Sequence, residues 1–467
     1  MLHGVQRLAG SDAGFLFIET PEQTSVCVDV AILTPPGDGA PPLTLDDLRR
    51  RVAERLPLLP AWRWRLAEIP LGLHHPVWIE DPDFDLDYHL RQVMLPAPGG
   101  EPALDELLAD IEPQLLDLRH PLWQLVLVHG LEDGRQAIVF RFHHTIADGA
   151  ALLLTLDLLL DPGVEVADAE PRPAPPVPSR MALARAALRD LRRQWSEVPT
   201  MVRTTRARFA AVDERRARDV AEVPRAMGDA PGTRLNRPGP PVRTYGRTLL
   251  RTSDLQEVRR ATGATLNDVV LGVVAGALRS YLAELGELPD RPLVANVPVA
   301  GAPSDEPQQT YGNRFSNFFT TLATDVADPV ERLAAISAGT AEAKVQLDLQ
   351  GRDTLPAWLD RLPPAIARPA SRWMIRRTAA DPTTANFNVL VSNVRVPEPS
   401  WDLGGHGVEH LWMSGPIADD AGLNITVVGY GDQLHVSLVA SPVAVADASA
   451  ITDRLHAALE ELVTCTV

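Results

Sequence analysis

The residues best suited to chemistry are His143 and His144, which precede Asp148 and Gly149 at a fixed short distance. An imidazole titrates near pH 6.5, so a histidine held in a cleft can take a proton from an alcohol at neutral pH. The Asp148 carboxylate can brace the turn or a neighbouring arginine, and Gly149 would let the chain leave the strand tightly. A single buried histidine is more often a core residue, but the whole pattern favours a general base.

The flanking segments indicate how this pattern is positioned. Residues 123–128 and 137–142 are β-rich, and 129–134 predict a hairpin between them. The second strand would end at the histidines, and the apolar residues 150–160 predict a buried helix behind them. Successive side chains of a strand point to opposite faces, so we expect no metal ion shared by the two histidines. Pro121 and Trp123 are interpreted as packing residues that shape the cleft.

Composition narrows the class of protein. The 467 residues are 45% hydrophobic and 22% charged, as in ordinary globular proteins, and the formal charge of −17 argues against a nucleic-acid binder. Two cysteines give no disulfide framework and fit a reducing cytoplasm. We find no signal peptide at the start, and no uninterrupted apolar run of the length that spans a bilayer.

The chain divides into three predicted parts: 1–162, a Pro/Arg-rich crossover at 163–243, and 244–467. The crossover begins with a proline cluster at 171–178 and continues as a helix. Residues 181, 184, 188, 191 and 195 are apolar and share one face of that helix, flanked by arginines. Such a helix could dock on an anionic lipid surface or pack on its own protein. The same two explanations hold for the segment with Trp358, Trp373, Met374 and Ile375.

The last part contains an internal correspondence. Residues 423–430, a turn, 434–440, a loop and a helix at 449–463 repeat the order found around the histidines. Two related halves, of which only the first carries the histidines, would form a cleft between them. A strongly apolar helix at about 266–285 begins with Asn267 and Asp268, a pair that often caps a helix. Ser392 and Asn393 follow a strand-like run and either contact a substrate or cap the strand end.

Taken together, several motifs resemble one family. The pattern at 143–149 is similar to the HHxxxDG motif of the CoA-dependent acyltransferase superfamily. Segment 8–16, Pro121-Leu122-Trp123, the Asn-Asp pair within 265–271, Gly312-Asn313 and Val391-Ser392-Asn393-Val394 resemble, in this order, the bacterial wax ester synthase/acyl-CoA:diacylglycerol acyltransferases. The resemblance spans nearly the whole chain and is weakest over 163–243.

The resemblance implies an α/β (α+β) fold of two chloramphenicol-acetyltransferase-like halves, arranged as a pseudo-dimer with a substrate tunnel between them. It implies acyl transfer from acyl-CoA to diacylglycerol or a long-chain alcohol, giving triacylglycerol or wax ester, with no metal or prosthetic group. His144 would be the general base, and His143 would orient it or shape the pocket. Asp148 and Gly149 would hold the loop. Asn267 would donate to the oxyanion, and Asp268 would fix its helix.

Direct transfer needs a base, an oxyanion donor and two aligned substrates. The chain has no G-x-S-x-G element and no activated cysteine, which disfavours a hydrolase. The alternatives are a relative that uses other alcohols or a carrier-bound acyl donor, and a non-catalytic lipid-body protein. Because the substrates would be apolar, we expect a cytoplasmic protein attached to the inner membrane face or to lipid bodies, without an obligate protein partner.

Overall fold

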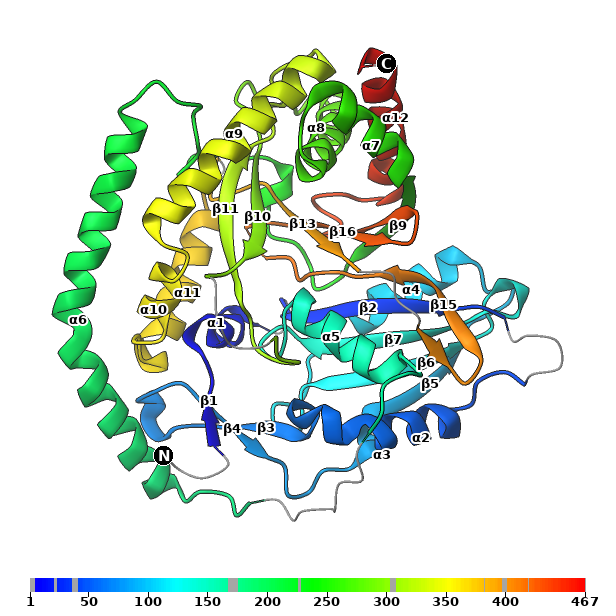
Figure 1. Cartoon of the computed structure of the whole chain (residues 1–467), viewed down its shortest axis with the longest axis vertical. Coiled ribbons are helices and arrows are strands. Elements are labelled where there is room, and N and C mark those ends of the chain that lie inside the picture. Colours follow the sequence, from blue (N-terminus) through cyan, green and yellow to red (C-terminus); the bar gives the residue numbers. More distant parts are fainter. Residues whose placement is uncertain are drawn as a thin grey trace.

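The computed structural model describes residues 5–20, 23–35, 41–166, 175–225, 228–302, 308–381, 383–396, 401–418 and 420–466. These residues form two large mixed sheets stacked along the long axis of the molecule, with the helices arranged around them (Figure 1). The proline cluster at 171–178 falls partly outside the described residues.

The first sheet holds the histidine strand. Its order is β14 (Asp402–Leu403), β15 (His406–Trp412), β2 (Val26–Leu33), β7 (Gln136–His143), β6 (Trp123–His129) and β5 (Leu90–Met94). The predicted hairpin is confirmed, since β6 pairs antiparallel with β7. Around this sheet lie α1 (Gly10–Ile18), α2 (Leu45–Arg55), α3 (Leu86–His89), α4 (Glu101–Ile111) and α5 (Gly149–Leu160). A small sheet of β1 (Val5–Arg7), β4 (Val77–Glu80) and β3 (Trp64–Ala67) completes this half.

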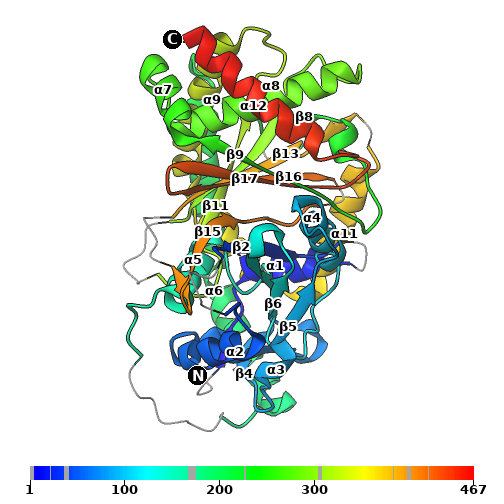
Figure 2. The same cartoon turned by 90° about the vertical axis from the view of Figure 1, so that its right-hand side faces the viewer.

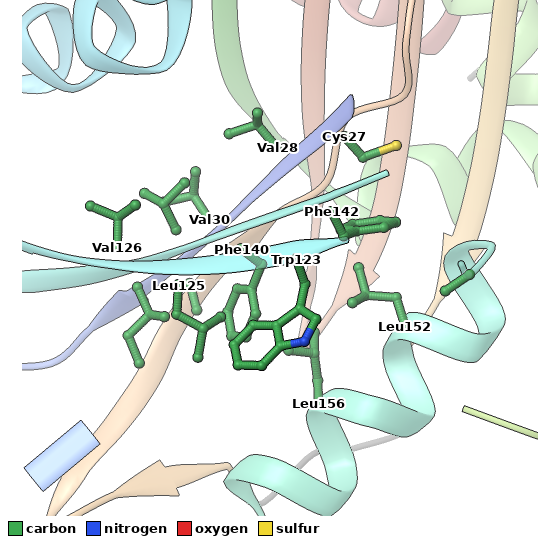
Figure 3. Packing of buried hydrophobic residues seen from close by; sticks show 14 of the residues in the cluster. Cys27, Val28, Val30, Trp123, Leu125, Val126, Phe140, Phe142, Leu152 and Leu156 are labelled. Atoms are coloured by element: carbon green, nitrogen blue, oxygen red, sulfur yellow. The ribbon is translucent and has the colours of Figure 1, made fainter. Parts of the chain in front are cut away.

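The helix α5 covers one face of the first sheet and forms the core with it. Figure 3 shows Leu152 and Leu156 of α5 facing the Trp123 indole and Phe142. All four side chains are buried. Trp123 also stacks on Trp62 at 4.1 Å between ring centroids, and its indole N–H donates to the Trp62 carbonyl. This apolar packing fixes the end of β7, from which the histidines project.

The second sheet has the order β11 (Phe315–Thr321), β10 (Val294–Ala300), β13 (Val389–Arg395), β16 (Leu423–Tyr430), β17 (Gln433–Ala440) and β9 (Thr244–Arg251). Figure 2 shows α7 (Thr252–Thr262), α8 (Leu266–Glu284), α9 (Pro329–Gln350) and α12 (Ser449–Thr466) on the face of this sheet that points away from the first half. The series β16, β17 and α12 repeats β6, β7 and α5. This repetition confirms the predicted correspondence and the two-halved α/β fold.

The crossover contains one long helix, α6 (Arg180–Arg216), at one side of the molecule (Figure 1). Leu183 and Ala187 are its buried residues near the N-terminus, whereas Met181, Leu188 and Trp195 of the predicted apolar face are exposed. Next to α6 lie α10 (Thr354–Leu359) and α11 (Pro364–Ala379), and β8 (Ala230–Pro231) pairs with β12 (Thr384–Ala385). The apolar face of α6 therefore does not pack on the protein itself.

The C-terminal part of the chain contributes a strand to the first sheet. Although β15 comes from the last third of the chain, it pairs with β2 in the first sheet. The predicted domain boundaries at 162 and 243 stay predictions. The strand order shows in addition that residues 402–412 belong to the first sheet.

Among the residues that the structure describes, α8 alone is long and apolar enough to cross a membrane by length and composition. Most of it is buried in the core of the C-terminal half against α9 and α12, as in a core helix of a soluble fold.

Candidate active site

His144 sits in the turn that follows β7, with its ring held from both sides. The ring stacks on Phe15 of α1 at 4.1 Å between centroids and lies edge-on to Phe315 of β11 at 6.0 Å. The backbone N–H of His144 donates to the Ser25 carbonyl at 2.8 Å. Elements from both halves therefore fix the position of this imidazole.

Asn313 contacts His144 through its side-chain amide. The amide nitrogen donates to the His144 carbonyl at 2.8 Å, and the Asn313 side chain raises the pKa of the imidazole. Burial lowers the pKa of His144 below its usual value, against the opposing effects of its own carbonyl, Asp148 and Asn313. The ring is therefore neutral at pH 7 and able to accept a proton.

His143 has a different environment, because it is completely buried. Its Nδ1 accepts the Thr145 N–H at 3.1 Å, and its Nε2 lies 3.2 Å from a Glu19 carboxylate oxygen. Because Nδ1 accepts a hydrogen bond, the neutral ring carries its proton on Nε2, which lies close to Glu19 without a hydrogen bond. This arrangement supports the interpretation of His143 as an orienting residue rather than a base.

Asp148 links the histidine motif to α5 and to the second half. One carboxylate oxygen caps α5 by accepting the Ala151 N–H, and the other accepts the backbone N–H of Arg314 at 2.7 Å. The contact with Arg314 is to its backbone, so Asp148 binds the second half through the main chain.

Gly149 plays a different part from the one we expected. It is the first residue of α5 and does not have a left-handed backbone. A Cβ there would make only ordinary contacts with Val394 and Met413. The tight turn therefore does not require glycine, and the site has room for a methyl group.

A segment of the second half lies alongside the histidine loop and is hydrogen-bonded to it. Gly312 donates to the Ile146 carbonyl at 2.7 Å and accepts from Asp148 N–H at 3.3 Å. The Asn313 backbone N–H donates to Asp12, a buried carboxyl whose pKa is raised to about 7 by burial. Sequence reasoning assigned no role to Asp12, Glu19 or Phe15. The only signal was that Asp12 and Phe15 lie in the opening segment that resembles the family.

The other predicted site residues fall into two groups. Pro121 is buried beside Trp123, which lines a small apolar cavity next to Ile146 and Ala147 of the histidine loop. Ser392 and Asn393 lie on β13, just before Val394, which reaches Gly149. Both pairs are thus close to the motif.

The Asn-Asp pair lies elsewhere, at the start of α8. Asp268 closes a capping box with Thr265 and accepts the Thr340 hydroxyl at 2.6 Å, which agrees with its predicted role of fixing the helix. The partly buried Asn267 side chain makes no hydrogen bond to another described residue. The contacts described for the histidine loop come from α1 and the segment after it, from Leu122 and from residues 312–315, and none involves Asn267. Its role as oxyanion donor stays a prediction.

Comparison with known families agrees with this geometry. The model of the wax ester synthase/diacylglycerol acyltransferase catalytic domain matches residues 8–270, and that of the C-terminal domain matches residues 311–463. The chain belongs to this family of acyltransferases. A Mycobacterium tuberculosis protein named as a diacylglycerol O-acyltransferase is 33% identical over 462 residues, which cover 98% of this chain and 96% of the relative. A second from the same species is 34% identical, with 98% and 97% covered.

Solved structures show the same architecture. The wax ester synthase/diacylglycerol acyltransferase of Marinobacter aquaeolei is 25% identical with a TM-score of 0.65, and the match covers 99% of this chain and 100% of that one. A condensation domain of the calcium-dependent antibiotic synthetase has a TM-score of 0.61 at 18% identity, with 99% and 97% covered. The second likeness concerns the fold alone.

Proposed function

We propose that this acyltransferase moves a fatty acyl group from acyl-CoA directly to the hydroxyl of diacylglycerol or a long-chain alcohol, with His144 as general base. The observation that carries the proposal is the position of the His144 ring at the junction of the two halves, stacked on Phe15 and edge-on to Phe315, where burial lowers its pKa. Membership of the family supports the same chemistry.

Asn313 would set the tautomer of this base. Nδ1 of His144 and the side-chain oxygen of Asn313 are both buried without a hydrogen-bond partner. With its proton on Nδ1, facing the Asn313 oxygen and the His144 carbonyl, the ring keeps its lone pair on Nε2. In this proposal Nε2 is the nitrogen that accepts the proton of the substrate hydroxyl.

The transfer would then proceed in two steps without a covalent enzyme intermediate. The acceptor oxygen forms a bond to the thioester carbonyl carbon while its proton moves to His144 Nε2. The tetrahedral intermediate collapses, the carbon–sulfur bond breaks, and the departing sulfur takes the proton from the imidazolium. The products are an ester and free CoA, and no metal or prosthetic group takes part. Asn267 remains the proposed donor to the oxyanion.

The cavity beside the loop would hold part of an apolar chain. Its lining is mostly aromatic and aliphatic and includes Trp62, Trp123, Phe142 and Leu152. Such walls suit an acyl or alkyl chain rather than a polar acceptor. Because the proposed acceptor and the acyl chain are apolar, we also propose that the enzyme works at the inner membrane face or on lipid bodies in the cytoplasm.

The test is release of free CoA from palmitoyl-CoA with dioleoylglycerol or hexadecanol as acceptor. Wild type, His144→Ala and the control His456→Ala would be compared, with the lipid products identified. We expect acceptor-dependent release that falls at least about a hundredfold in His144→Ala and stays unchanged in the control. The better acceptor identifies the product.

No release with either acceptor would contradict the neutral-lipid proposal. Activity that instead appeared with an acyl group on a carrier protein would favour a carrier-bound donor.

A further inference from the structure

The outer face of α6 carries exposed apolar side chains at a regular interval. Met181, Leu188 and Trp195 are 63%, 48% and 67% exposed and are spaced by seven residues, which places them on one side of the helix. The buried Leu183 and Ala187 occupy the opposite side. Large apolar residues repeated on a solvent-facing stripe usually mark an interaction surface.

A second apolar group lies on neighbouring elements. Helix α11 exposes Ile366 (57%) and Trp373 (61%), also seven residues apart. The short 3-10 helix η3 (Pro70–Gly72) contacts both α6 and α11 and carries Leu71, which is 86% exposed. We call these six residues the apolar face: Leu71, Met181, Leu188, Trp195, Ile366 and Trp373.

Arginines surround the apolar face. Helix α6 has ten arginines and four acidic residues, and α11 has four arginines and no acidic residue. The two helices therefore carry charges of +6 (10 − 4) and +4 within a chain of net charge −17.

The acidic residues of the N-terminal half of α6 are turned toward the protein. Asp190 pairs with Arg7, and Glu197 pairs with Arg361. Among the described contacts, Arg185, Arg189 and Arg192 have no acidic partner and remain exposed. Their charge is thus available to an outside partner.

We propose that the apolar face and its arginines bind the surface of an anionic phospholipid membrane. Tryptophan and leucine can enter the headgroup boundary while arginine side chains reach anionic headgroups. A chain of charge −17 is repelled by such a membrane, so docking requires a local positive region. A second copy of the chain is a poorer partner, because two such faces repel each other. This proposal does not depend on the acyl transfer proposed above.

The test is co-sedimentation of the whole protein with vesicles of phosphatidylcholine alone or mixed with phosphatidylglycerol, without substrate. Two variants remove the two parts of the surface: Trp195→Glu/Trp373→Glu and Arg185→Glu/Arg189→Glu/Arg192→Glu. We expect binding only to the mixed vesicles, weakened at least about tenfold in each variant. The matched controls are Met94→Glu, at a methionine that is 70% exposed on β5, and Arg259→Glu/Arg260→Glu on α7, and both should bind like wild type.

A second readout guards against misfolded variants. Lipids brominated on the acyl chains should quench wild-type tryptophan fluorescence, and the milder Trp195→Phe/Trp373→Phe variant should lose most of that quenching. Equal binding by variants and wild type, or equal binding to uncharged vesicles, would overturn the proposal. Acyl transfer from detergent-dispersed substrates should be normal in these variants, so a membrane-binding defect is distinguishable from a failure of catalysis.

Discussion

Asn313 joins the two halves at a single side chain, and it should control the acidity of His144. Because its hydrogen bond raises the pKa of His144, Asn313→Ala should lower that pKa further. Asn313→Asp would place a carboxylate beside the ring and raise the pKa. In the pH profile of kcat/KM, the acid limb of the wild type should lie below pH 6.5. It should shift to lower pH in Asn313→Ala and to higher pH in Asn313→Asp. We expect kcat to fall about 10- to 100-fold in Asn313→Ala.

If Asn313 had a purely structural role, both variants would lose activity, but the acid limbs of their pH profiles would not shift in opposite directions. Asn386→Ala is the matched control, since Asn386 is a part-buried asparagine of the same half whose amide donates to Asp420. Its pH profile should match that of wild type.

Two glycines near the motif should respond oppositely to alanine. Gly312 has φ +83°, a conformation that costs an L-residue about 1–2 kcal/mol, and its backbone bonds the histidine loop. Gly149 has an ordinary helical backbone and room for a methyl group. Thermal unfolding should show a lower Tm for Gly312→Ala and an unchanged or slightly higher Tm for Gly149→Ala. A large loss in Gly149→Ala would mean that contacts with Val394 and Met413 are tighter than they appear.

At the scale of elements, two neighbouring residues at the start of α8 should have different roles, Asp268 in stability and Asn267 in catalysis. Asp268→Ala removes the capping box and the hydrogen bond from the Thr340 hydroxyl, which keeps only the Ser337 carbonyl as acceptor; the change should cost about 2 kcal/mol in urea unfolding. Asn267→Ala should change stability little, because its side chain makes no described hydrogen bond. If Asn267 supplies the oxyanion donor, kcat should fall about 100- to 1,000-fold. Normal kcat in Asn267→Ala would end that assignment.

Local elements were predictable from the sequence because their signals are local. The hairpin before His143, the apolar helix α5 and the repeat β16, β17 and α12 all follow from periodicity and turn residues. Long-range contacts left no such signal. Nothing in the sequence Gly312-Asn313 indicates that this segment hydrogen-bonds to Ile146 of the histidine loop. Nothing in residues 406–412 indicates that they form a strand of the first sheet rather than of the second. Likewise, the sequence of α6 does not indicate which side of the helix packs on the protein, so the exposure of Met181, Leu188 and Trp195 could not be predicted from it.

At the scale of the whole molecule, a buried ion pair connects the two halves. Arg243, just before β9, lies 3.1 Å from Glu112 at the end of α4, and both side chains are almost fully buried. Burial raises the pKa of Glu112 to about 7, while Arg243 and Arg141 lower it. Removing one partner leaves the other charge buried and alone.

We therefore expect Arg243→Met to reduce the free energy of unfolding by about 3 kcal/mol, and the double variant with Glu112→Leu to recover most of it. The pKa of Glu112 rises further in the single variant. Below about pH 7 the carboxyl is protonated in both folded proteins, so the deficit is constant. Above pH 7 only wild type ionises it, so the deficit should grow by up to about 1.4 kcal/mol per pH unit. Urea unfolding at pH 6 and pH 8.5 checks this, and a deficit independent of pH would contradict it.

The pairing of β15 with β2 also has a consequence for biosynthesis. β2 ends at Leu33, but its outer neighbour begins only at His406. At about 5–20 residues per second, a ribosome needs tens of seconds between the two. During that time the nascent first sheet has an open, apolar edge that can pair with other chains. Slower elongation or loss of chaperones should therefore harm the yield of this enzyme more than its stability once folded, and the first half expressed alone should aggregate.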